Sequence, residues 1–253
     1  INFMRVIMKT TDFGYKKIYF DEKENMVKNV FDSVSNKYDL MNDIMSLFIH
    51  RLWKDISVFY CDINKGNRIL DLAGGTGDLA KRFSHFVGEN GEIIIGDINF
   101  NMLKVGKEKL TNQGFLNNIK YVQMNAEMLP FVDNYFDCVS IGFGIRNFTN
   151  KLDSLKNIYR VLKRGGKLMI LEFSHPTNDL ISSLYDLYSF NFLPKIGKLI
   201  CSDEYSYRYL VESIRLHPSQ DELLKIIKCA SFKECSYRNL FNGIVSIHIG
   251  IKY

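Results

Sequence analysis

A chain of 253 residues, with 46% hydrophobic and 24% charged residues, is long enough to bury a sizeable core and too apolar to be a disordered protein. The net charge of +5 is mild, and without a dense block of Lys and Arg it gives no reason to expect nucleic acid as a partner. It is compatible with an anionic membrane surface. The five cysteines form no CxxC pair and no Cys/His ligand spacing, so we expect reduced thiols and no metal site. The longest apolar stretches are too short to span a bilayer.

The first 61 residues carry a helical pattern without a strand pattern. Residues 1–22 have a mixed composition, and we expect a flexible lead there. Residues 23–61 place apolar residues near helical spacing, which predicts two helices, on the evidence of Met26, Val30, Val34, Met41, Ile44, Met45, Phe48 and Leu52.

After residue 66 the pattern changes to short apolar runs that end in acidic residues or glycine: "RILDLA", "EIIIGD", "IKYVQMNA", "FDCVSIGFG" and "KLMILEFS". Amphipathic stretches such as 100–111 and 151–162 separate them. Strands that are apolar on both faces and alternate with helices predict an α/β fold with a parallel sheet covered on both sides. Ligands bind such sheets at the carboxyl ends of the strands, where Asp71, Asp97, Asn125 and Gly142 fall. The sequence therefore predicts a single cleft at that edge.

The last third of the chain interrupts this alternation and then resumes it. Residues 178–215 are aromatic and helical, and we interpret them as an insertion that caps the cleft. A helix near 219–229 follows, and then the strands "FKECSYR" and "GIVSIHIGIK", which a short link joins into an antiparallel hairpin at the sheet edge. We expect one domain over residues 1–253.

The stretch "ILDLAGGTGDLA", residues 69–80, contains a G-x-G-x-x-A loop directly after a predicted strand. A loop of this kind lets the amino end of a helix approach the pyrophosphate of a nicotinamide dinucleotide. The same turn fits the methionine part and ribose of S-adenosylmethionine. Asp97, twenty residues after Gly77, can bind ribose hydroxyls in either case, so it favours an adenosine ligand without choosing between the two. Glycine turns also follow many strands that bind nothing.

Three features favour S-adenosylmethionine. Asp71, at the strand end, can meet an ammonium group or an ordered water, and together with Asp78 it would repel a pyrophosphate. Asn125, in "NAEMLPF", can bind the adenine edge. "RVLKRGGKLMILEFS" gives a helix, a glycine turn and a strand. The sequence thus predicts S-adenosylmethionine as co-substrate, with these candidate binding residues: Asp71, Gly75, Thr76, Gly77, Asp97, Ile98, Asn125, Ala126 and Gly142.

Five separated motifs in one order carry a closer resemblance: "YDLMNDIMSLFIHRLW", "GFGIRNFTN", "RVLKRGGKLMILEFS", "YLVESIRLHPSQ" and "GIVSIHIGIK". They are similar to signatures of the ubiquinone/menaquinone-biosynthesis C-methyltransferase family, from about residue 10 to the end. "GDINFNMLKVGKEK" and "GIRNFT" resemble its eukaryotic ubiquinone branch most. Two positions depart from the family: Arg164 stands where Pro is usual, and Gly142 where some bacterial members have Ser.

The resemblance implies a class I S-adenosylmethionine-dependent methyltransferase fold, in which a mostly parallel seven-stranded sheet has an antiparallel edge hairpin. It implies C-methylation of a polyprenylated methoxy-benzoquinol. It also implies a mitochondrial location on the matrix side of the inner membrane, with peripheral membrane contact and partners in a quinone-biosynthesis complex. A homodimer is compatible with it. On this interpretation the aromatic residues of 180–201 would form a wall for the polyprenyl tail.

The chemistry needs a ring carbon made nucleophilic by loss of a hydroxyl proton and held in line with the sulfonium methyl group. Arg146, past the fourth strand, is our candidate to stabilise the phenolate or to hold a water, with Asn147 orienting the same oxygen. Alternatively, Arg146 anchors its loop to a carboxylate. His50 and His175 are alternative bases. We expect His50 to be structural because it lies among apolar residues, whereas His175 should lie nearer the cleft.

Other functions remain open from the residues alone. These are demethylmenaquinol C-methylation, a methyltransferase acting on another apolar acceptor, a scaffold subunit of the same fold, and a nicotinamide-dependent dehydrogenase. The two carboxylates at the glycine loop disfavour the last. Nothing in the sequence calls for a metal.

Overall fold

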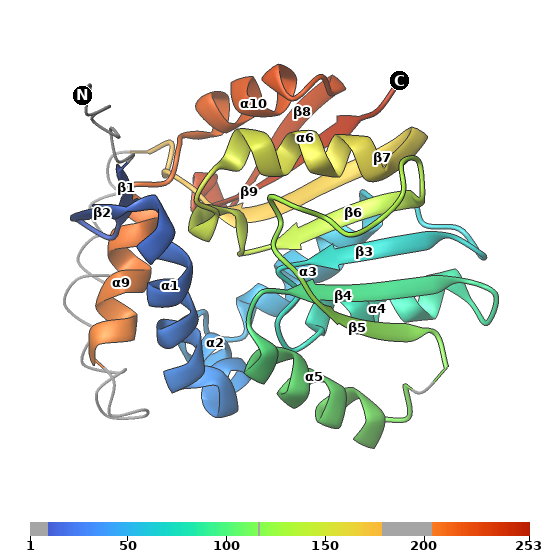
Figure 1. Ribbon diagram of the computed structural model, residues 1–253, viewed down its shortest axis with the longest axis horizontal. Helices are drawn as coiled ribbons and strands as arrows, with labels where there is room; N and C mark the ends of the chain where they lie inside the picture. The colour runs from blue at the N-terminus through green and yellow to red at the C-terminus, as the bar shows by residue number, and fades with distance from the viewer. Residues whose placement is uncertain (1–9, 116, 179–203) are drawn as a thin grey trace, which may run out of the picture.

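The seven-stranded sheet at the centre of the molecule has the strand order β5-β4-β3-β6-β7-β9-β8. It is seen in a computed structural model that describes residues 10–115, 117–178 and 204–253 (Figure 1). The strands from β3 to β7 run parallel, whereas β9 is antiparallel to both β7 and β8. Their bounds are β3 (Arg68–Leu72), β4 (Glu92–Asp97), β5 (Ile119–Gln123), β6 (Phe136–Gly142), β7 (Leu162–Phe173), β8 (Lys233–Leu240) and β9 (Val245–Ile251).

This arrangement confirms the predicted α/β fold, its parallel strands and its antiparallel edge hairpin. One local prediction was wrong. The pair Gly165-Gly166 does not form a turn before the fifth strand but lies inside β7, which already begins at Leu162. The pairing of β7 with β6 is irregular at this point, and Gly165 has φ of 78°. The two glycines therefore absorb an irregularity within a strand.

Alternate residues of the parallel strands pack on opposite faces of the sheet, as the two-residue period of a strand requires. One face carries Ile69, Ile93 and Ile95 and is covered by α3 (Ile49–Phe59), α4 (Asp78–Val87) and α5 (Phe100–Asn112). The other carries Leu70, Leu72 and Ile94 and is covered by α6 (Lys151–Val161) and α10 (Gln220–Cys229) (Figure 1). These two layers bury the core and leave the carboxyl ends of the strands free for a third group of elements.

That third group covers the carboxyl end of the sheet, on the left of Figure 1. It consists of β1 (Thr10–Phe13), β2 (Lys16–Tyr19), α1 (Phe20–Val34), the single turn Ser35–Lys37, α2 (Tyr38–Met45) and α9 (Glu204–Arg215). Phe13 stacks on Tyr209 of α9 with ring centroids 4.2 Å apart, and both pack on Val27 and Val30 of α1. A second small cluster joins Val34 and Met41 to α9. The amino-terminal segment and α9 thus form one cover.

The amino-terminal prediction needs two corrections. Residues 10–19 form an antiparallel hairpin where we expected a flexible lead, and the 23–61 range holds three helices, not two. The break between α2 and α3 lies at Leu47 and Phe48, which have φ of 48° and 64°. Residues other than glycine seldom adopt this left-handed conformation, and hydrophobic spacing does not reveal it.

Of the predicted capping insertion, only 178 and α9 lie among the described residues, so the expected aromatic wall of 180–201 lies outside them. In the part of the chain that the structure describes, no helix is both long and apolar enough to cross a membrane.

Candidate active site

The glycine loop of residues 73–77 joins β3 to α4 by a tight turn. Gly75 and Gly77 have φ of 53° and 77°, and the peptide N–H of Gly77 donates to the carbonyl of Gly74 at 2.9 Å. A Cβ atom on Gly74 would lie 2.8 Å from the backbone oxygen of Asp71. Glycine is therefore required here both by backbone conformation and by space.

The Gly77→Ala variant should lower the free energy of unfolding by about 2–4 kcal/mol, because alanine is strained at this φ and overpacks the core. Its Cβ would lie 2.7 Å from side-chain carbons of both Ile95 and Leu110. Gly165→Ala is the matched control, since Gly165 has φ of 78° but no atom within 4 Å of its Cβ position. Denaturant unfolding should show a cost of about 1 kcal/mol for the control. Equal costs would contradict the crowding at Gly77.

Asp97, the last residue of β4, faces the loop. Its Oδ2 accepts from the peptide N–H of Gly75 at 2.9 Å, and its Oδ1 accepts from that of Asn99 at 2.8 Å. Burial raises the pKa of this carboxyl to about 6, although both N–H donors oppose the shift. The carboxylate is thus fixed by backbone donors and keeps lone pairs for a ligand hydroxyl.

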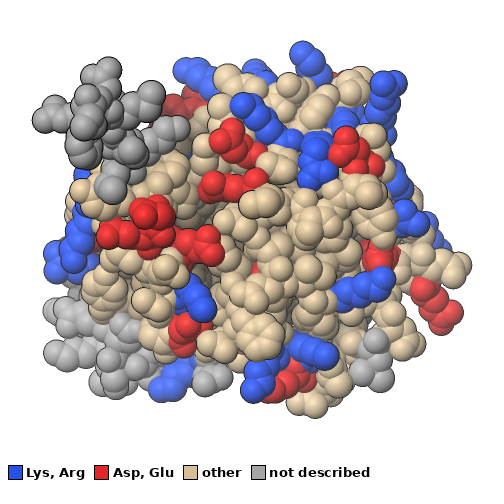
Figure 2. All heavy atoms as spheres, viewed as in Figure 1, with Lys and Arg blue, Asp and Glu red and all other residues tan. Residues whose placement is uncertain are grey.

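A cavity opens between Asp97 and α1, and we call it the sheet-edge cavity. Six of the predicted cofactor residues line it: Gly75, Asp97, Ile98, Asn125, Ala126 and Gly142. Its opposite wall is one face of α1, made of Glu24, Val27, Lys28 and Phe31. Figure 2 shows acidic side chains on both sides of the hollow between the α1 side of the molecule and the sheet. Such a rim favours a ligand that carries positive charge.

Asn125 is already engaged within this cavity. Its Nδ2 donates to Oε2 of Glu24 at 3.1 Å, and its Oδ1 accepts from the peptide N–H of Glu127 at 2.8 Å. The side chain therefore ties the β5 loop to α1. Contact with an adenine edge would have to share these groups.

A smaller loop cavity lies beside the glycines, and Asp71, Thr76, Lys54 and Asp78 line it. Asp71 accepts from the Ser140 hydroxyl at 2.9 Å and from the peptide N–H of Ala80 at 3.1 Å. Burial raises the pKa of Asp71 to about 7, against these two hydrogen bonds. At neutral pH this group is therefore a partly protonated, internally bonded carboxyl.

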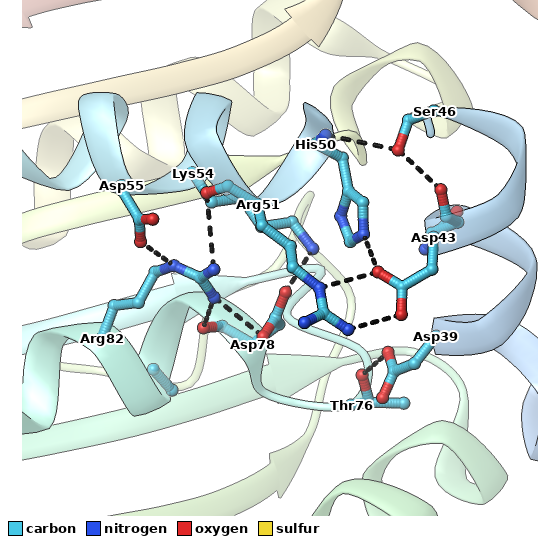
Figure 3. A network of polar contacts seen from close by, with 12 residues as sticks. Asp39, Asp43, Ser46, His50, Arg51, Lys54, Asp55, Thr76, Asp78 and Arg82 are labelled. Carbon is cyan, nitrogen blue, oxygen red and sulfur yellow. Dashed lines mark hydrogen bonds and ion pairs between the residues drawn. The ribbon is translucent and has the colours of Figure 1, made fainter. Parts of the chain in front are cut away.

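A network of ion pairs surrounds the loop cavity and connects α2, α3 and α4 (Figure 3). Asp78 pairs with Lys54 at 2.7 Å and with Arg82 at 2.8 Å. Burial would raise the pKa of Asp78, but the two cations outweigh it and lower it. Because its charge is compensated, Asp78 would repel a pyrophosphate less than the sequence suggests. Thr76, which we predicted to contact the co-substrate, donates its hydroxyl to Asp39 of α2 at 2.8 Å and so ties the loop to the cover.

A third, helix-side cavity lies between α1, α2, α3 and α9. It is mostly apolar, and its walls include Val30, Val34, Met41, Trp53, Phe173, Leu210 and Ile214. Tyr38 and Phe143 line this cavity, the sheet-edge cavity and the loop cavity alike. The three spaces therefore meet at these two rings. Phe143 has φ of 58°, a strained backbone of the kind that often marks functional sites.

The helix-side cavity is bordered by polar atoms that lack a partner. Nε of Arg146, Nδ1 of His50 and Nε1 of Trp53 are buried and have no hydrogen-bond partner among the residues that the structure describes. All three residues line this cavity. Buried polar groups normally find partners, and orphaned ones in an apolar space are typical of a site that receives a polar ligand group.

Arg146 makes the contact that one of its two predicted roles requires, an anchor to a carboxylate, and it also lines the helix-side cavity. Its NH1 group pairs with Oε1 of Glu172 at 2.9 Å and donates to the carbonyl of Phe143, so it does anchor its loop to a buried carboxylate. Its Nε is buried and has no hydrogen-bond partner in the part of the chain that the structure describes. Burial would lower the pKa of this guanidinium, but Glu172 outweighs it and the pKa is raised. Arg146 is therefore a fixed cation.

Asn147 and His175 lie in different surroundings. Asn147 lines the sheet-edge cavity, and its Oδ1 accepts from the hydroxyl of Tyr209 at 2.9 Å, which fixes its amide. His175 borders none of the three cavities. Its Nε2 lies 2.8 Å from the carbonyl of His217, away from the place where we expected a base. Gly77 also lines none of the three cavities, and its role is in the packing of the loop.

The sequence interpretation underrated His50 and missed the face of α1. His50 borders the cavity because α3 turns there after a break that the sequence did not reveal. The α1 residues Glu24, Val27, Lys28 and Phe31 follow the i, i+3, i+4, i+7 spacing of one helix face. That face mixes charged and apolar residues, and this mixture was the sequence signal that could have revealed it.

The strand order, the glycine loop and the acidic residue that ends the second parallel strand define a class I S-adenosylmethionine-dependent methyltransferase. The family model of the ubiE/COQ5 methyltransferase family matches residues 19–252. The chain therefore belongs to this family and is an S-adenosylmethionine-dependent C-methyltransferase of ubiquinone/menaquinone biosynthesis.

Similar proteins agree at the level of sequence and of fold. The ubiquinone/menaquinone biosynthesis C-methyltransferase UbiE of Pseudoalteromonas translucida is 55% identical over 97% of this chain and 98% of its own length. That of Proteus mirabilis is 53% identical with the same coverage. A methyltransferase structure from Aquifex aeolicus, 19% identical, has a TM-score of 0.60 over 84% of this chain and 96% of its own. One from Thermotoga maritima, 18% identical, has 0.63 over 89% and 99%.

Proposed function

We propose that the acceptor is a polyprenylated methoxy-benzoquinol, methylated on a ring carbon in ubiquinone biosynthesis. The observation that carries this proposal is the apolar helix-side cavity, which shares Tyr38 and Phe143 with the sheet-edge cavity beside it and is lined by Arg146. An acceptor of this kind needs apolar walls for its ring and tail and a cation for its ionised oxygen. A water-soluble acceptor would need neither.

The residues of the sheet-edge cavity and of the glycine loop fit S-adenosylmethionine. Asp97 would bind the ribose hydroxyls, Asn125 and Ala126 would border the adenine, and the glycine loop would lie beside the methionine part. When bound, this co-substrate supplies an electrophilic methyl group on its sulfonium. Arg146 would stabilise the phenolate, Asn147 would orient its oxygen, and the aromatic walls would exclude water. His175 has no part in this scheme, because it borders none of the cavities.

Mass spectrometry of a short-chain 2-methoxy-6-polyprenyl-1,4-benzoquinol, kept reduced and incubated with enzyme and S-adenosylmethionine, tests the proposal. We expect a gain of one methylene unit, which fragmentation assigns to a ring carbon. The oxidised quinone is the matched control and should not react, because its ring carbon is not nucleophilic. Methyl gain on oxygen, or no gain from the quinol, would contradict the proposed chemistry.

Demethylmenaquinol is the second candidate acceptor, because the names of the similar proteins cover both ubiquinone and menaquinone. A short-chain demethylmenaquinol in the same assay distinguishes the two by kcat/KM. A higher kcat/KM for the naphthoquinol would mean that demethylmenaquinol, and not the benzoquinol, is the acceptor.

We further propose that the protein belongs to the eukaryotic ubiquinone branch and acts on the matrix side of the mitochondrial inner membrane, within a quinone-biosynthesis complex. The "GDINFNMLKVGKEK" and "GIRNFT" motifs support the branch. The similar proteins reported above are bacterial and do not distinguish it. The net charge of +5 supports contact with an anionic surface. Flotation with anionic vesicles, against neutral vesicles, tests the membrane contact, and isolation of the native protein from mitochondria tests the location.

A further inference from the structure

The polar atoms around the helix-side cavity include one that can act as a base. Among Arg146, Trp53 and His50, only the imidazole of His50 can accept a proton, because guanidinium and indole N–H groups are donors. His50 is 6% exposed and borders the cavity from α3, and its Nδ1 has no partner among the described residues 10–115, 117–178 and 204–253. We therefore expect this cavity to bind a ligand that can share a proton with the unpaired imidazole nitrogen.

Asp43 of α2 orients this imidazole. Its Oδ1 lies 2.8 Å from Nε2 of His50, and the Arg51 guanidinium holds both of its oxygens, with Nε at 2.8 Å and NH2 at 2.5 Å (Figure 3). Burial would raise the pKa of the Asp43 carboxyl, but the hydrogen bonds from Arg51 and His50 outweigh it and lower it. A carboxylate fixed in this way favours a proton on Nε2 and leaves a lone pair on Nδ1.

The surroundings of His50, its burial first, favour the neutral form of the imidazole. Burial lowers the pKa of the imidazole, Lys54 lowers it further, and Asp43 and Asp78 oppose them. The charged and titratable groups that line a cavity together with His50 lie on two sides. On the helix side they are Tyr38, Arg146, Tyr207 and Tyr209. On the opposite, polar side they are Asp39, Asp43, Arg51, Asp55, Asp78, Lys81, Arg82, His85 and Lys109, and Lys54 lies one turn further along α3. A neutral imidazole is the form that a general base requires.

Resting on the proposed function, we infer that His50, oriented by Asp43, is the general base that ionises the quinol. The hydroxyl proton passes to Nδ1 of His50, and Arg146 stabilises the oxygen left behind. The ring carbon then bonds to the methyl carbon while the methyl–sulfur bond breaks, with its electron pair staying on sulfur. Loss of the proton from the methylated carbon to water restores the aromatic ring, and the oxygen regains its proton from His50. One proton is released overall.

The first test compares pH–rate profiles of the full enzyme with the short-chain benzoquinol described above. His50→Ala should lower kcat about 100-fold near neutral pH and leave KM for the quinol nearly unchanged, since a base acts on the proton transfer. The deficit should shrink as pH approaches the hydroxyl pKa of about 10 for a phenol, because solvent then ionises the acceptor. Added imidazole should restore part of the rate.

Matched variants separate a base from a structural residue. His50→Gln keeps a polar side chain toward Asp43 without a basic nitrogen and should show the same deficit even if His50→Ala folds poorly. Asp43→Asn should lower kcat less, because Asp43 only positions the ring. His85→Ala removes an exposed histidine of α4 and should retain the wild-type rate.

Three results would overturn the inference. The first is a His50→Gln enzyme within a few-fold of the wild-type kcat. The second is a deficit that stays constant with pH and does not respond to imidazole, since that describes a structural role. The third is a wild-type enzyme that binds S-adenosylmethionine but leaves the quinol unmethylated. This last result overturns the proposed function itself, and it is recognised before any variant is measured.

Discussion

Replacing Arg146 by methionine should lower the free energy of unfolding by about 3–5 kcal/mol, the usual cost of removing one partner from a buried ion pair. Glu172 has no exposed surface and would be left without its buried partner. The same change should lower kcat about 100-fold to 1,000-fold, since a fixed cation at a developing oxyanion contributes that much. Denaturant unfolding and steady-state kinetics measure the two effects.

The double variant Arg146→Met/Glu172→Gln distinguishes the anchoring role from the catalytic one. Without the buried charge, part of the lost stability should return, because the single oxygen of Gln can still accept from the peptide N–H of Phe173. Activity should stay low, because no cation faces the acceptor. A double variant that regains both stability and kcat would mean that Arg146 only anchors its loop.

The sheet could be predicted from sequence because its inner parallel strands are buried on both faces. Such strands are continuous apolar runs, and the runs of β3, β4 and β6 are almost fully buried here. The position of the ligand cavity followed from the same fact, since the carboxyl ends of parallel strands lie at one edge. Asp97, Asn125 and Gly142 were predicted in this way, and all three line the sheet-edge cavity.

The cover over that edge could not be predicted, because it depends on contacts between distant segments. The hairpin of residues 10–19 is held by Phe13 on Tyr209, a pair far apart in sequence. The turn between α2 and α3 depends on left-handed backbone at Leu47 and Phe48. Neither feature leaves a periodic signal.

The sequence was equally limited in deciding which of the two histidines, His50 or His175, is the better candidate base. His175 follows a strand end, which made it the better candidate, yet β7 directs it toward His217 and away from the cavities. His50 lies on a helix among apolar residues, which made it look structural. An apolar surrounding is also what a cavity wall looks like in sequence, so burial alone could not separate the two interpretations.

Asp97→Asn should weaken S-adenosylmethionine binding about 100-fold to 1,000-fold, because two hydrogen bonds from ribose hydroxyls would lose their charged acceptor. Calorimetric titration measures this directly, without an acceptor. The side chain of Asn keeps the volume of Asp, and one oxygen can still accept from the peptide N–H of Gly75. Retained affinity would therefore mean that Asp97 braces the loop and does not bind the ribose.

In the wild-type enzyme, the affinity for S-adenosylmethionine should depend on pH, because Asp97 ionises. Burial holds the pKa of Asp97 at about 6 in the free enzyme, above the ordinary value for an aspartate, so the carboxylate that accepts from the ribose forms only as pH rises through 6. Ionised Asp97 binds the hydroxyls better than the protonated form, and the dissociation constant should therefore rise about tenfold between pH 7 and pH 5.

Asp71, with a pKa raised to about 7, is the second carboxyl at the glycine loop that titrates in this range. Its hydrogen bonds run to Ser140 and Ala80, inside the fold, so Asp71→Asn should keep a transition near pH 6 whatever it does to affinity. Asp97→Asn should remove that transition. If the two variants behave in the opposite way, the group that controls binding of the co-substrate is the one at the end of β3, and the ribose lies closer to the loop than the sheet-edge cavity suggests.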